Sequence, residues 1–172
     1  MDRRSFILAS FFGVSALVIQ SMTGAFAMGF FQGNKDKDKK NNKFPYELSD
    51  KEWMNKLSKE QYYVLRDHGT ERAGTSQFND EKRNGSYHCA GCDNELFSSQ
   101  HKFDSGTGWP SYYQPVREGA VGTTKDYKLL IPRVEVHCSN CGGHLGHVFE
   151  DGPEPTGLRY CINGVALTFK PT

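Results

Sequence analysis

The sequence predicts a mainly β protein with short helices at the start of its domain. Two segments, Val134–Cys138 and Leu158–Phe169, alternate between apolar and polar residues, as strands with one buried face do. The 18 glycines and the aromatic content of 13% suit a turn-rich β architecture better than a helical bundle. Helical signals occur only ahead of these segments. We therefore expect an antiparallel β core with a helical N-terminal flank.

Length and charge bound the organisation of the chain. With 172 residues, one compact domain is expected. We place it at residues 44–172, which carry 14 basic and 17 acidic side chains, a net charge of −3. A mildly acidic domain does not favour nucleic acid or another polyanion as a partner. We expect the domain to act as a monomer.

Residues 1–27 are typical of an export signal. Arg3 and Arg4 form a twin-arginine pair, and the apolar run behind them is shorter than the ~20 residues of a membrane span. Ala25–Ala27 resembles a small-residue cleavage site. We expect export to the bacterial periplasm, with membrane anchoring as the alternative if the segment is not cleaved. Residues 28–43 follow as a charged, flexible linker, because NKDKDKKNNK combines dense charge with low hydrophobicity.

Two capping boxes predict short helices at the start of the domain. Ser49 with Glu52 forms the first, and Ser58 with Gln61 forms the second. In a capping box the two side chains bond each other's backbone N–H groups, which marks a helix start. We expect the second helix to end at Gly69, because glycine commonly terminates helices.

Four of the five cysteines form two CxxC pairs, and they predict a metal site. The four are Cys89, Cys92, Cys138 and Cys141. Each pair has the shape of a zinc knuckle, and two knuckles supply the four thiolate ligands of one closed, structural Zn²⁺ site. Such a site would join two distant segments of the sheet. His88 and His137 precede the pairs directly and are expected to face away from the metal.

Disulfides are the alternative interpretation of the paired cysteines. An exported protein meets an oxidising compartment, where two disulfides would persist. A single redox-active CxxC is a further option, but no βαβ pattern surrounds either pair. The twin-arginine route carries proteins that are already folded, so zinc could be loaded in the cytosol before export. We therefore favour zinc.

The fifth cysteine stands apart in RYCINGV. Strand alternation places Arg159, Cys161 and Asn163 on one face. A neighbouring positive charge favours the nucleophilic thiolate, and the carboxamide offers a donor to a polar substrate group. A small buried hydrophobe, the usual fate of a free cysteine, is the alternative. Because Arg159 and Asn163 are polar neighbours on the same face, we favour a reactive thiol.

Three further side chains are candidates for the same site. His144 and His147 follow the second cysteine pair closely, and either could donate a proton near neutral pH. A polar surface position or a satisfied, half-buried histidine is the alternative for both. Trp109 lies in a rigid turn between a glycine and a proline. It could form the wall of a pocket, although a core position is the commoner role of tryptophan.

The motifs in their order resemble one known family. The chain contains GTER at Gly69, then YHCAGC, SGTGWPSYYQPV, VHCSNCGGHLGHVF and GLRYCINGVALTF, spread over about residues 46–170. Together they resemble the type B methionine sulfoxide reductases, which act on methionine-(R)-sulfoxide. The resemblance implies two antiparallel β-sheets with a zinc site on the side away from the active centre. It also implies oxidised proteins or the free sulfoxide as substrate, and a thioredoxin-like or small-thiol reductant.

The resemblance also assigns catalytic roles. It makes Cys161 the nucleophile that attacks the sulfoxide sulfur and becomes a sulfenic acid. His144 and His147, with Asn163, would bind and protonate the sulfoxide oxygen. Arg159 would assist the thiolate.

The motif around Trp109 carries both a role and a departure. Trp109, helped by Phe149, would form the apolar wall that receives the substrate methyl group. Many family members have a cysteine where this chain has Thr107, and that cysteine converts the sulfenic acid into a disulfide. Because the other four cysteines are assigned to zinc, we expect an external thiol or a periplasmic thioredoxin-like partner to reduce the Cys161 sulfenic acid directly.

Two other function classes compete with this interpretation. A cysteine hydrolase could use Cys161 with a histidine and an asparagine, but such nucleophiles usually stand at a helix N-terminus rather than in a strand. A non-catalytic binding module built on zinc is the second alternative. Replacing Cys161 would leave the function of such a module intact.

Overall fold

The computed structural model describes residues 44–129 and 131–172. The predicted signal at 1–27 and the predicted linker at 28–43 therefore lie outside the described residues. Within the described part of the chain, no helix is long and apolar enough to cross a membrane.

Two short helices open the described part. Helix α1 spans Asp50–Lys56 and helix α2 spans Lys59–Leu65. Both predicted capping boxes are present, with Ser49 and Ser58 as the N-caps. The expected end at Gly69 is wrong, because α2 ends at Leu65 and the chain leaves it through an irregular turn.

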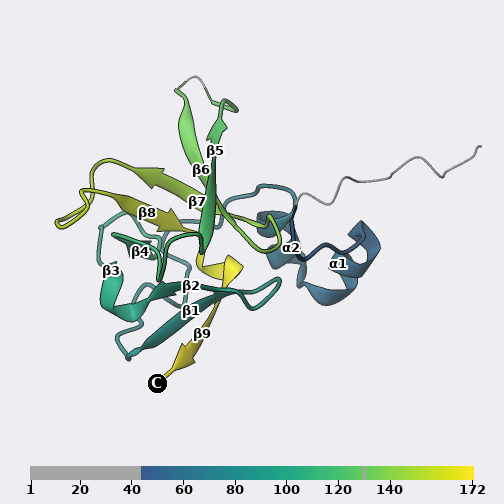
Figure 1. Cartoon of the computed structure of the whole chain (residues 1–172), viewed down its shortest axis with the longest axis horizontal. Coiled ribbons are helices and arrows are strands. Elements are labelled where there is room, and N and C mark those ends of the chain that lie inside the picture. The colour runs from purple at the N-terminus through teal and green to yellow at the C-terminus, as the bar shows by residue number, and fades with distance from the viewer. Residues whose placement is uncertain (1–43, 130) are drawn as a thin grey trace, which may run out of the picture. The chain divides into compact units, whose positions relative to one another are not determined.

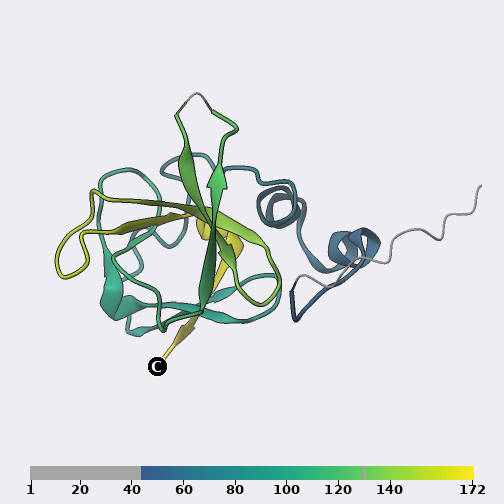
Figure 2. The same ribbon diagram turned by 45° about the horizontal axis from the view of Figure 1, so that its top comes forward.

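The strands form two antiparallel sheets, as expected. The three-stranded sheet has the order β2-β1-β9, with β2 at Glu95–Ser98, β1 at Gly85–Cys89 and β9 at Leu167–Pro171. The six-stranded sheet has the order β3-β4-β8-β7-β6-β5. Its strands span Lys102–Phe103 (β3), Ser111–Tyr112 (β4), Arg159–Ile162 (β8), His144–Phe149 (β7), Arg133–Cys138 (β6) and Val121–Asp126 (β5). Strands β5 and β6 extend beyond their neighbours as a long hairpin (Figure 1, Figure 2).

The segment Leu158–Phe169, expected to be one alternating strand, is divided. Its first part is β8 and its last part belongs to β9, so the two parts pair in different sheets. A 3₁₀ turn, η2 at Gly164–Ala166, joins them. A similar turn, η1, spans Ser99–His101. Gly164 packs so closely against Ser76 that a side chain would not fit. The strand alternation therefore ends at this glycine, where the chain packs closely against Ser76.

Aromatic side chains fill the space between the sheets. The rings of Phe97 and Tyr112 stack with centroids 4.3 Å apart, and Tyr87 meets Tyr112 edge-on at 5.1 Å. All three side chains are fully buried. Because Tyr112 belongs to one sheet and the other two rings to the other, these contacts join the two layers.

Helices α1 and α2 lie against the cysteine pairs. A Cβ atom on Gly91 would stand 3.3 Å from the buried Trp53 ring, and one on Gly143 would stand 2.9 Å from Leu65. The guanidinium of Arg66 lies 4.9 Å from the centroid of the Trp53 ring and donates to the carbonyl of Cys141 at 3.2 Å. The helices are therefore packed onto the backbone that carries the cysteines.

Candidate active site and metal centre

The two cysteine pairs meet in space. The sulfur of Cys89 lies 3.7 Å from that of Cys141, and the sulfur of Cys92 lies 3.6 Å from that of Cys138. All four Sγ atoms lie within 4.8 Å of one another. A disulfide needs sulfurs at ~2.05 Å, so these distances do not fit bonded pairs. Tetrahedral coordination with bonds of ~2.3 Å places sulfurs about 3.8 Å apart, which these distances match. The four cysteines are arranged for a structural metal.

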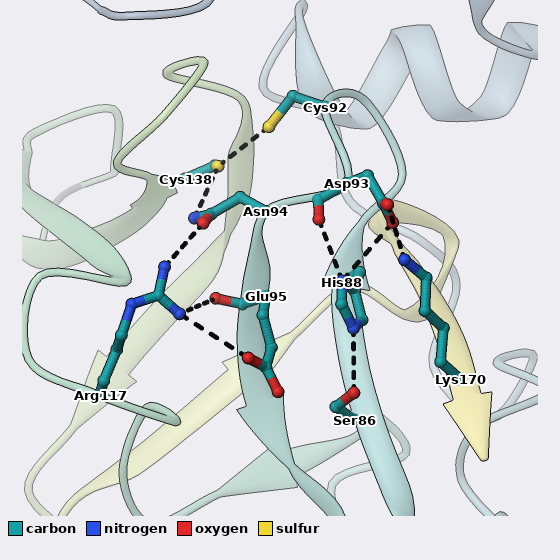
Figure 3. A network of polar contacts seen from close by, with 9 residues as sticks. All are labelled: Ser86, His88, Cys92, Asp93, Asn94, Glu95, Arg117, Cys138 and Lys170. Atoms are coloured by element: carbon teal, nitrogen blue, oxygen red, sulfur yellow. Dashed lines mark hydrogen bonds and ion pairs between the residues drawn. The ribbon is translucent and has the colours of Figure 1, made fainter. Parts of the chain in front are cut away.

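A polar network supports one of these sulfurs (Figure 3). The amide of Asn94 lies 3.6 Å from the sulfur of Cys138 and also donates to the carbonyl of Ala120 at 3.0 Å. Arg117 donates to the Asn94 side-chain oxygen at 3.0 Å, which fixes the amide with its NH₂ towards the sulfur. Donors of this kind orient a thiolate ligand and balance its charge.

The two histidines next to the cysteine pairs make other contacts. His88 contacts Ser86 through Nε2 at 2.9 Å and the Asp93 carbonyl through Nδ1 at 3.0 Å (Figure 3). The ring of His137 packs edge-on against Phe44, with centroids 5.6 Å apart. Both rings therefore face away from the four sulfurs, as expected.

Cys161 lies in the interior of the six-stranded sheet. It pairs with Ser111 on β4 and with His147 on β7, and His147 in turn pairs with Glu135 on β6. Directly opposed residues on antiparallel strands have Cβ atoms only ~4.5–5.5 Å apart. Strand register therefore brings the thiol, an imidazole and a carboxylate into one row.

A cavity of about 110 Å³ opens over the thiol. Its lining includes five of the residues singled out from the sequence, namely Cys161, His147, Trp109, Phe149 and Asn163. Thr70 and Arg133 complete its polar side. The cavity thus combines a thiol, an aromatic wall and polar groups.

Burial and charge act in opposite directions on the Cys161 thiol. Burial raises its pKa, while the Thr107 hydroxyl, at 3.9 Å from the sulfur, and the charge of Arg159 lower it. Burial is the larger effect, so the net pKa lies above the ordinary value. The thiolate expected from the arginine alone is therefore not the resting form of the free site at neutral pH.

Arg159 is itself held in place. Its guanidinium donates two hydrogen bonds of 2.9 Å to the carboxylate of Asp151 and lies 4.4 Å from the centroid of the Phe149 ring. Arg159 is buried, with 9% of its surface exposed. A fixed guanidinium of this kind supplies a stationary positive charge near the thiol.

His144 and His147 are each paired with a carboxylate. Nδ1 of the buried His144 lies 2.7 Å from Glu135, and Nε2 of His147 lies 2.7 Å from Asp126. Arg133 binds the same Asp126 oxygen at 2.7 Å. Burial lowers the pKa of both histidines although the carboxylates oppose this. Both rings are therefore neutral in the free site. Glu135 and Asp126 stabilise the protonated form of each ring when it accepts a proton.

Asn163 is a structural junction as well as a wall of the cavity. Its Nδ2 donates to the carbonyl of Leu145 at 2.8 Å, and its Oδ1 accepts from the backbone N–H of Glu71 at 2.8 Å. The amide nitrogen carries two hydrogens, so one is left for a ligand in the cavity.

Glu71 connects three parts of the site. Its carboxylate accepts from the backbone N–H of Gly164 at 2.7 Å, and its carbonyl accepts from the indole N–H of Trp109 at 2.9 Å. Its own N–H donates to Asn163, so this one residue connects the aromatic wall to the turn that follows Cys161. The GTER motif was visible in the sequence, but nothing local indicated these distant partners.

A second, polar cavity of about 370 Å³ adjoins the first and shares Thr70, Arg133 and His147 with it. Sequence reasoning missed most of its lining: His68, Lys125, Asp126, Tyr127, Lys128 and Glu135. The alternation of β6 places Glu135 on the polar face, which was the one available signal. His144, the remaining residue, was singled out from the sequence.

Comparison with known proteins identifies the family. A model described as the SelR domain matches residues 57–171. A peptide methionine sulfoxide reductase MsrB of Agrobacterium fabrum is 54% identical over 123 residues, covering 72% of this chain and 91% of the relative. An MsrB of Pseudomonas putida is 57% identical over 120 residues, covering 70% and 90%. A chloroplastic peptide methionine sulfoxide reductase B1 of Oryza sativa subsp. japonica is 53% identical over 125 residues, covering 73% and 58%. The chain therefore belongs to the SelR family, that of the MsrB-type peptide methionine sulfoxide reductases.

Proposed function

We propose that this protein reduces methionine-(R)-sulfoxide in oxidised proteins to methionine, with Cys161 as the nucleophile. Family membership supports methionine sulfoxide as the substrate. One observation of the site carries the assignment. The thiol lies in a cavity whose walls are Trp109 and Phe149 and whose polar side holds His147.

The two sides of the cavity suit the two ends of a sulfoxide. The apolar S-methyl group would rest against Trp109 and Phe149, while the oxygen would face His147 and the remaining amide hydrogen of Asn163. Sulfur would then stand over the Cys161 thiol. Exchanging the oxygen and the lone pair at sulfur would turn the oxygen away from its donors, which supports a preference for one stereoisomer.

The chemical step transfers oxygen from the substrate to the enzyme. The Cys161 sulfur attacks the sulfoxide sulfur, which becomes more electrophilic when a proton supplied through His147 or His144 reaches the substrate oxygen. The S–S bond formed in this attack and the S–O bond of the substrate break as the oxygen passes to the Cys161 sulfur. Methionine departs and the oxygen remains on Cys161 as a sulfenic acid, so the thiol is oxidised by two electrons while the sulfoxide is reduced by two. Asp126 and Glu135 position the imidazoles and stabilise their protonated forms.

Regeneration requires electrons from outside the chain. Thr107 lies beside Cys161, and the other four cysteines lie in the metal cluster. Two external thiols, or one dithiol of a thioredoxin-like partner, would convert the sulfenic acid to thiol and water and leave as a disulfide.

Zinc is the metal we propose for the four-cysteine cluster. Four convergent thiolates make a closed tetrahedral set, which is typical of structural Zn²⁺. When bound, the ion would cross-link the segments after β1 and β6. The catalytic steps make no use of it.

A stereospecific assay tests the proposed activity. Purified full-length protein, supplied with dithiothreitol, should reduce the R but not the S isomer of a methionine sulfoxide substrate. Cys161→Ser should abolish turnover and leave one zinc per chain, whereas Thr107→Ser, which keeps the hydroxyl, should stay active. Turnover of the S isomer alone, or full activity of Cys161→Ser, would reject the assignment. Peptidase activity would indicate a cysteine hydrolase instead.

The N-terminal sequence supports an exported enzyme. We propose that residues 1–27 direct the chain to the periplasm by a twin-arginine route. Replacing Arg3 and Arg4 with lysine should leave the protein in the cytoplasmic fraction. N-terminal sequencing of the periplasmic form should begin at Met28; an intact N-terminus in the membrane fraction would indicate an anchor.

A further inference from the structure

Two histidines and one carboxylate converge beside the catalytic cavity. Nδ1 of His68 lies 2.8 Å from Oε1 of Glu135, and Nδ1 of His144 lies 2.7 Å from the same oxygen. The three ligand atoms lie within 4.8 Å of one another. They come from three separate parts of the chain, so the convergence is a product of the fold.

We propose that His68, Glu135 and His144 bind one divalent transition-metal ion, such as Zn²⁺ or Ni²⁺, separate from the metal of the four cysteines. Two imidazoles and a carboxylate form a ligand set that such ions use when one position is left for water or another ligand. We call these three residues the His₂Glu cluster.

The donor geometry is close to what an ion requires. Bonds of ~2.0–2.2 Å place the ligand atoms of a tetrahedral site about 3.3–3.6 Å apart. The nitrogen–oxygen distances of 2.8 and 2.7 Å must therefore lengthen by about 0.5–0.9 Å, which side-chain rotation of Glu135 and the exposed His68 can supply. Both imidazole nitrogens already point at one carboxylate oxygen, so an ion would replace the protons that these contacts now hold.

The backbone at His68 is a second observation that favours a functional site. His68 has a φ of 55°, in the left-handed region that side chains other than glycine rarely adopt. In this conformation the ring of His68 contacts Glu135. Strained backbone of this kind is found preferentially at functional sites.

An ion can reach the His₂Glu cluster from solvent. The side chain of His68 is 44% exposed, whereas that of His144 is 4% exposed. All three residues line the polar cavity of about 370 Å³, where Asp126 adds a further acidic group. The open coordination position would therefore face this cavity, and His68 would be the ligand at its entrance.

Metal binding there would inhibit the enzyme. This consequence rests on the proposed function, in which His144 helps to deliver the proton. An ion on Nδ1 of His144 would take the place of the proton and separate the ring from Glu135. It would also add positive charge beside His147 and Arg133, which line the same cavity. The metal-bound enzyme would be a reversibly inactive form.

The binding experiment uses Ni²⁺, which prefers imidazole to the hard oxygen ligands of a protein surface. Untagged full-length protein that holds its cysteine-bound metal is dialysed against Ni²⁺, and the bound metals are quantified. Wild type should bind one Ni²⁺ in addition. His68→Ala should weaken this binding by about tenfold or more, since even the loss of a residue that supports a ligand costs that much.

The matched control is His101→Ala, which removes a histidine of η1 next to Tyr113. It should bind Ni²⁺ as wild type does. Equal Ni²⁺ affinity in wild type and His68→Ala would overturn the proposal. So would a thiolate-to-nickel charge-transfer band, because that band would place the ion on Cys161 or in the four-cysteine cluster.

The inhibition is tested without thiols, which would chelate the metal. Reduced enzyme is mixed with the R sulfoxide, and the single equivalent of methionine formed is followed in time. Saturating Ni²⁺ should slow this step by about a hundredfold, the contribution of a proton donor. An unchanged rate with Ni²⁺ bound would refute the inhibition. Absence of methionine in the metal-free reaction would instead refute the proposed function and leave the binding result standing.

Discussion

At the scale of single residues, the free Cys161 is kept mainly as a thiol. Burial raises its pKa, and neither the Thr107 hydroxyl nor the charge of Arg159 fully offsets this. His144 and His147 are shifted the other way, towards the neutral form. The form needed for attack, with a thiolate beside a protonated histidine, has the same net charge as this neutral pair. It can therefore form by moving one proton within the site.

Alkylation of Cys161 should show the effect of Arg159. The rate of reaction with iodoacetamide follows the thiolate, so its midpoint in pH should lie above the ordinary thiol pKa in wild type. Arg159→Gln removes a charge that favours the thiolate and should move the midpoint higher still. Arg83→Gln, on the surface, serves as the control and should not move it. An unchanged midpoint in Arg159→Gln would show that the guanidinium does not act on the thiol.

The pH profile of kcat/KM should be bell-shaped with a wide plateau. The lowered histidine pKa values place the acid limb below the ordinary pKa of histidine, and the raised thiol pKa places the alkaline limb above that of cysteine. Activity is lost in acid because the histidines are already protonated and cannot accept the thiol proton. It is lost in base because the thiol has released to solvent the proton that it would otherwise pass to a histidine. A narrow optimum centred on the ordinary histidine pKa would contradict this arrangement.

Thr107→Cys should give the enzyme an internal route of regeneration. The Thr107 hydroxyl oxygen lies 3.9 Å from the Cys161 sulfur, close enough for a disulfide after a small adjustment. One turnover without reductant should then leave a 107–161 disulfide, detectable by mass spectrometry of the digested protein, whereas wild type should hold a sulfenic acid. A stable sulfenic acid in the variant would show that the two positions cannot meet.

At the scale of elements, the site depends on how β8 is joined to its surroundings. The turn after Cys161 is fixed by Glu71, which accepts hydrogen bonds from Gly164 and Val165 and holds Trp109 through its carbonyl. One residue from the loop after α2 thus sets the position of the indole relative to the Cys161 thiol.

Glu71→Ala should destabilise the protein and impair its activity together. It leaves the N–H of the buried Gly164 without its partner, which costs about 1–3 kcal/mol in the free energy of unfolding. Denaturation in urea measures this loss, and Glu60→Ala, on the exposed side of α2, is the control with little expected change. A loss no larger than that of the control would show that the turn does not depend on Glu71.

Local sequence patterns predicted where helices and strands lie better than they predicted which distant residues these elements contact. Capping boxes placed the starts of α1 and α2, and alternation located β6 and β8. The crossing from β8 to β9 was missed because Gly164 reads as one more strand position until Ser76 is packed against it. The carboxylate partners of His144 and His147 were missed for the same reason, since strand register brings Glu135 and Asp126 to them.

At the scale of the whole molecule, the metal cluster joins parts that are far apart in sequence. It links the ends of β1 and β6, which belong to different sheets, and the helices pack against both cysteine pairs. Chain spacing alone predicted the ligand set, whereas the two-sheet arrangement around it followed only from the family resemblance. The sheet order depends on pairings that composition and periodicity do not encode.

Asn94→Ala should loosen the metal without touching a ligand. The variant removes the amide that faces the Cys138 sulfur and contacts Arg117. Metal affinity should fall by about 10–100-fold, measured by competition with a coloured chelator. Asn55→Ala, on the exposed surface of α1, should retain wild-type affinity. Equal affinities of both variants would show that the amide does not support the thiolate.

The pairing of sulfurs across the two cysteine pairs also sets a time scale for assembly. Each close contact joins one sulfur of the first pair to one of the second, and Cys138 follows Cys92 by 46 positions in the sequence. At a synthesis rate of ~5–20 residues per second, the first two thiols wait roughly 2–9 s for their partners to be made. During that interval the thiols of Cys89 and Cys92 in the nascent chain have no partner sulfurs with which to bind a metal. The cell's ability to keep them reduced then decides whether the finished chain receives a metal or a misplaced disulfide.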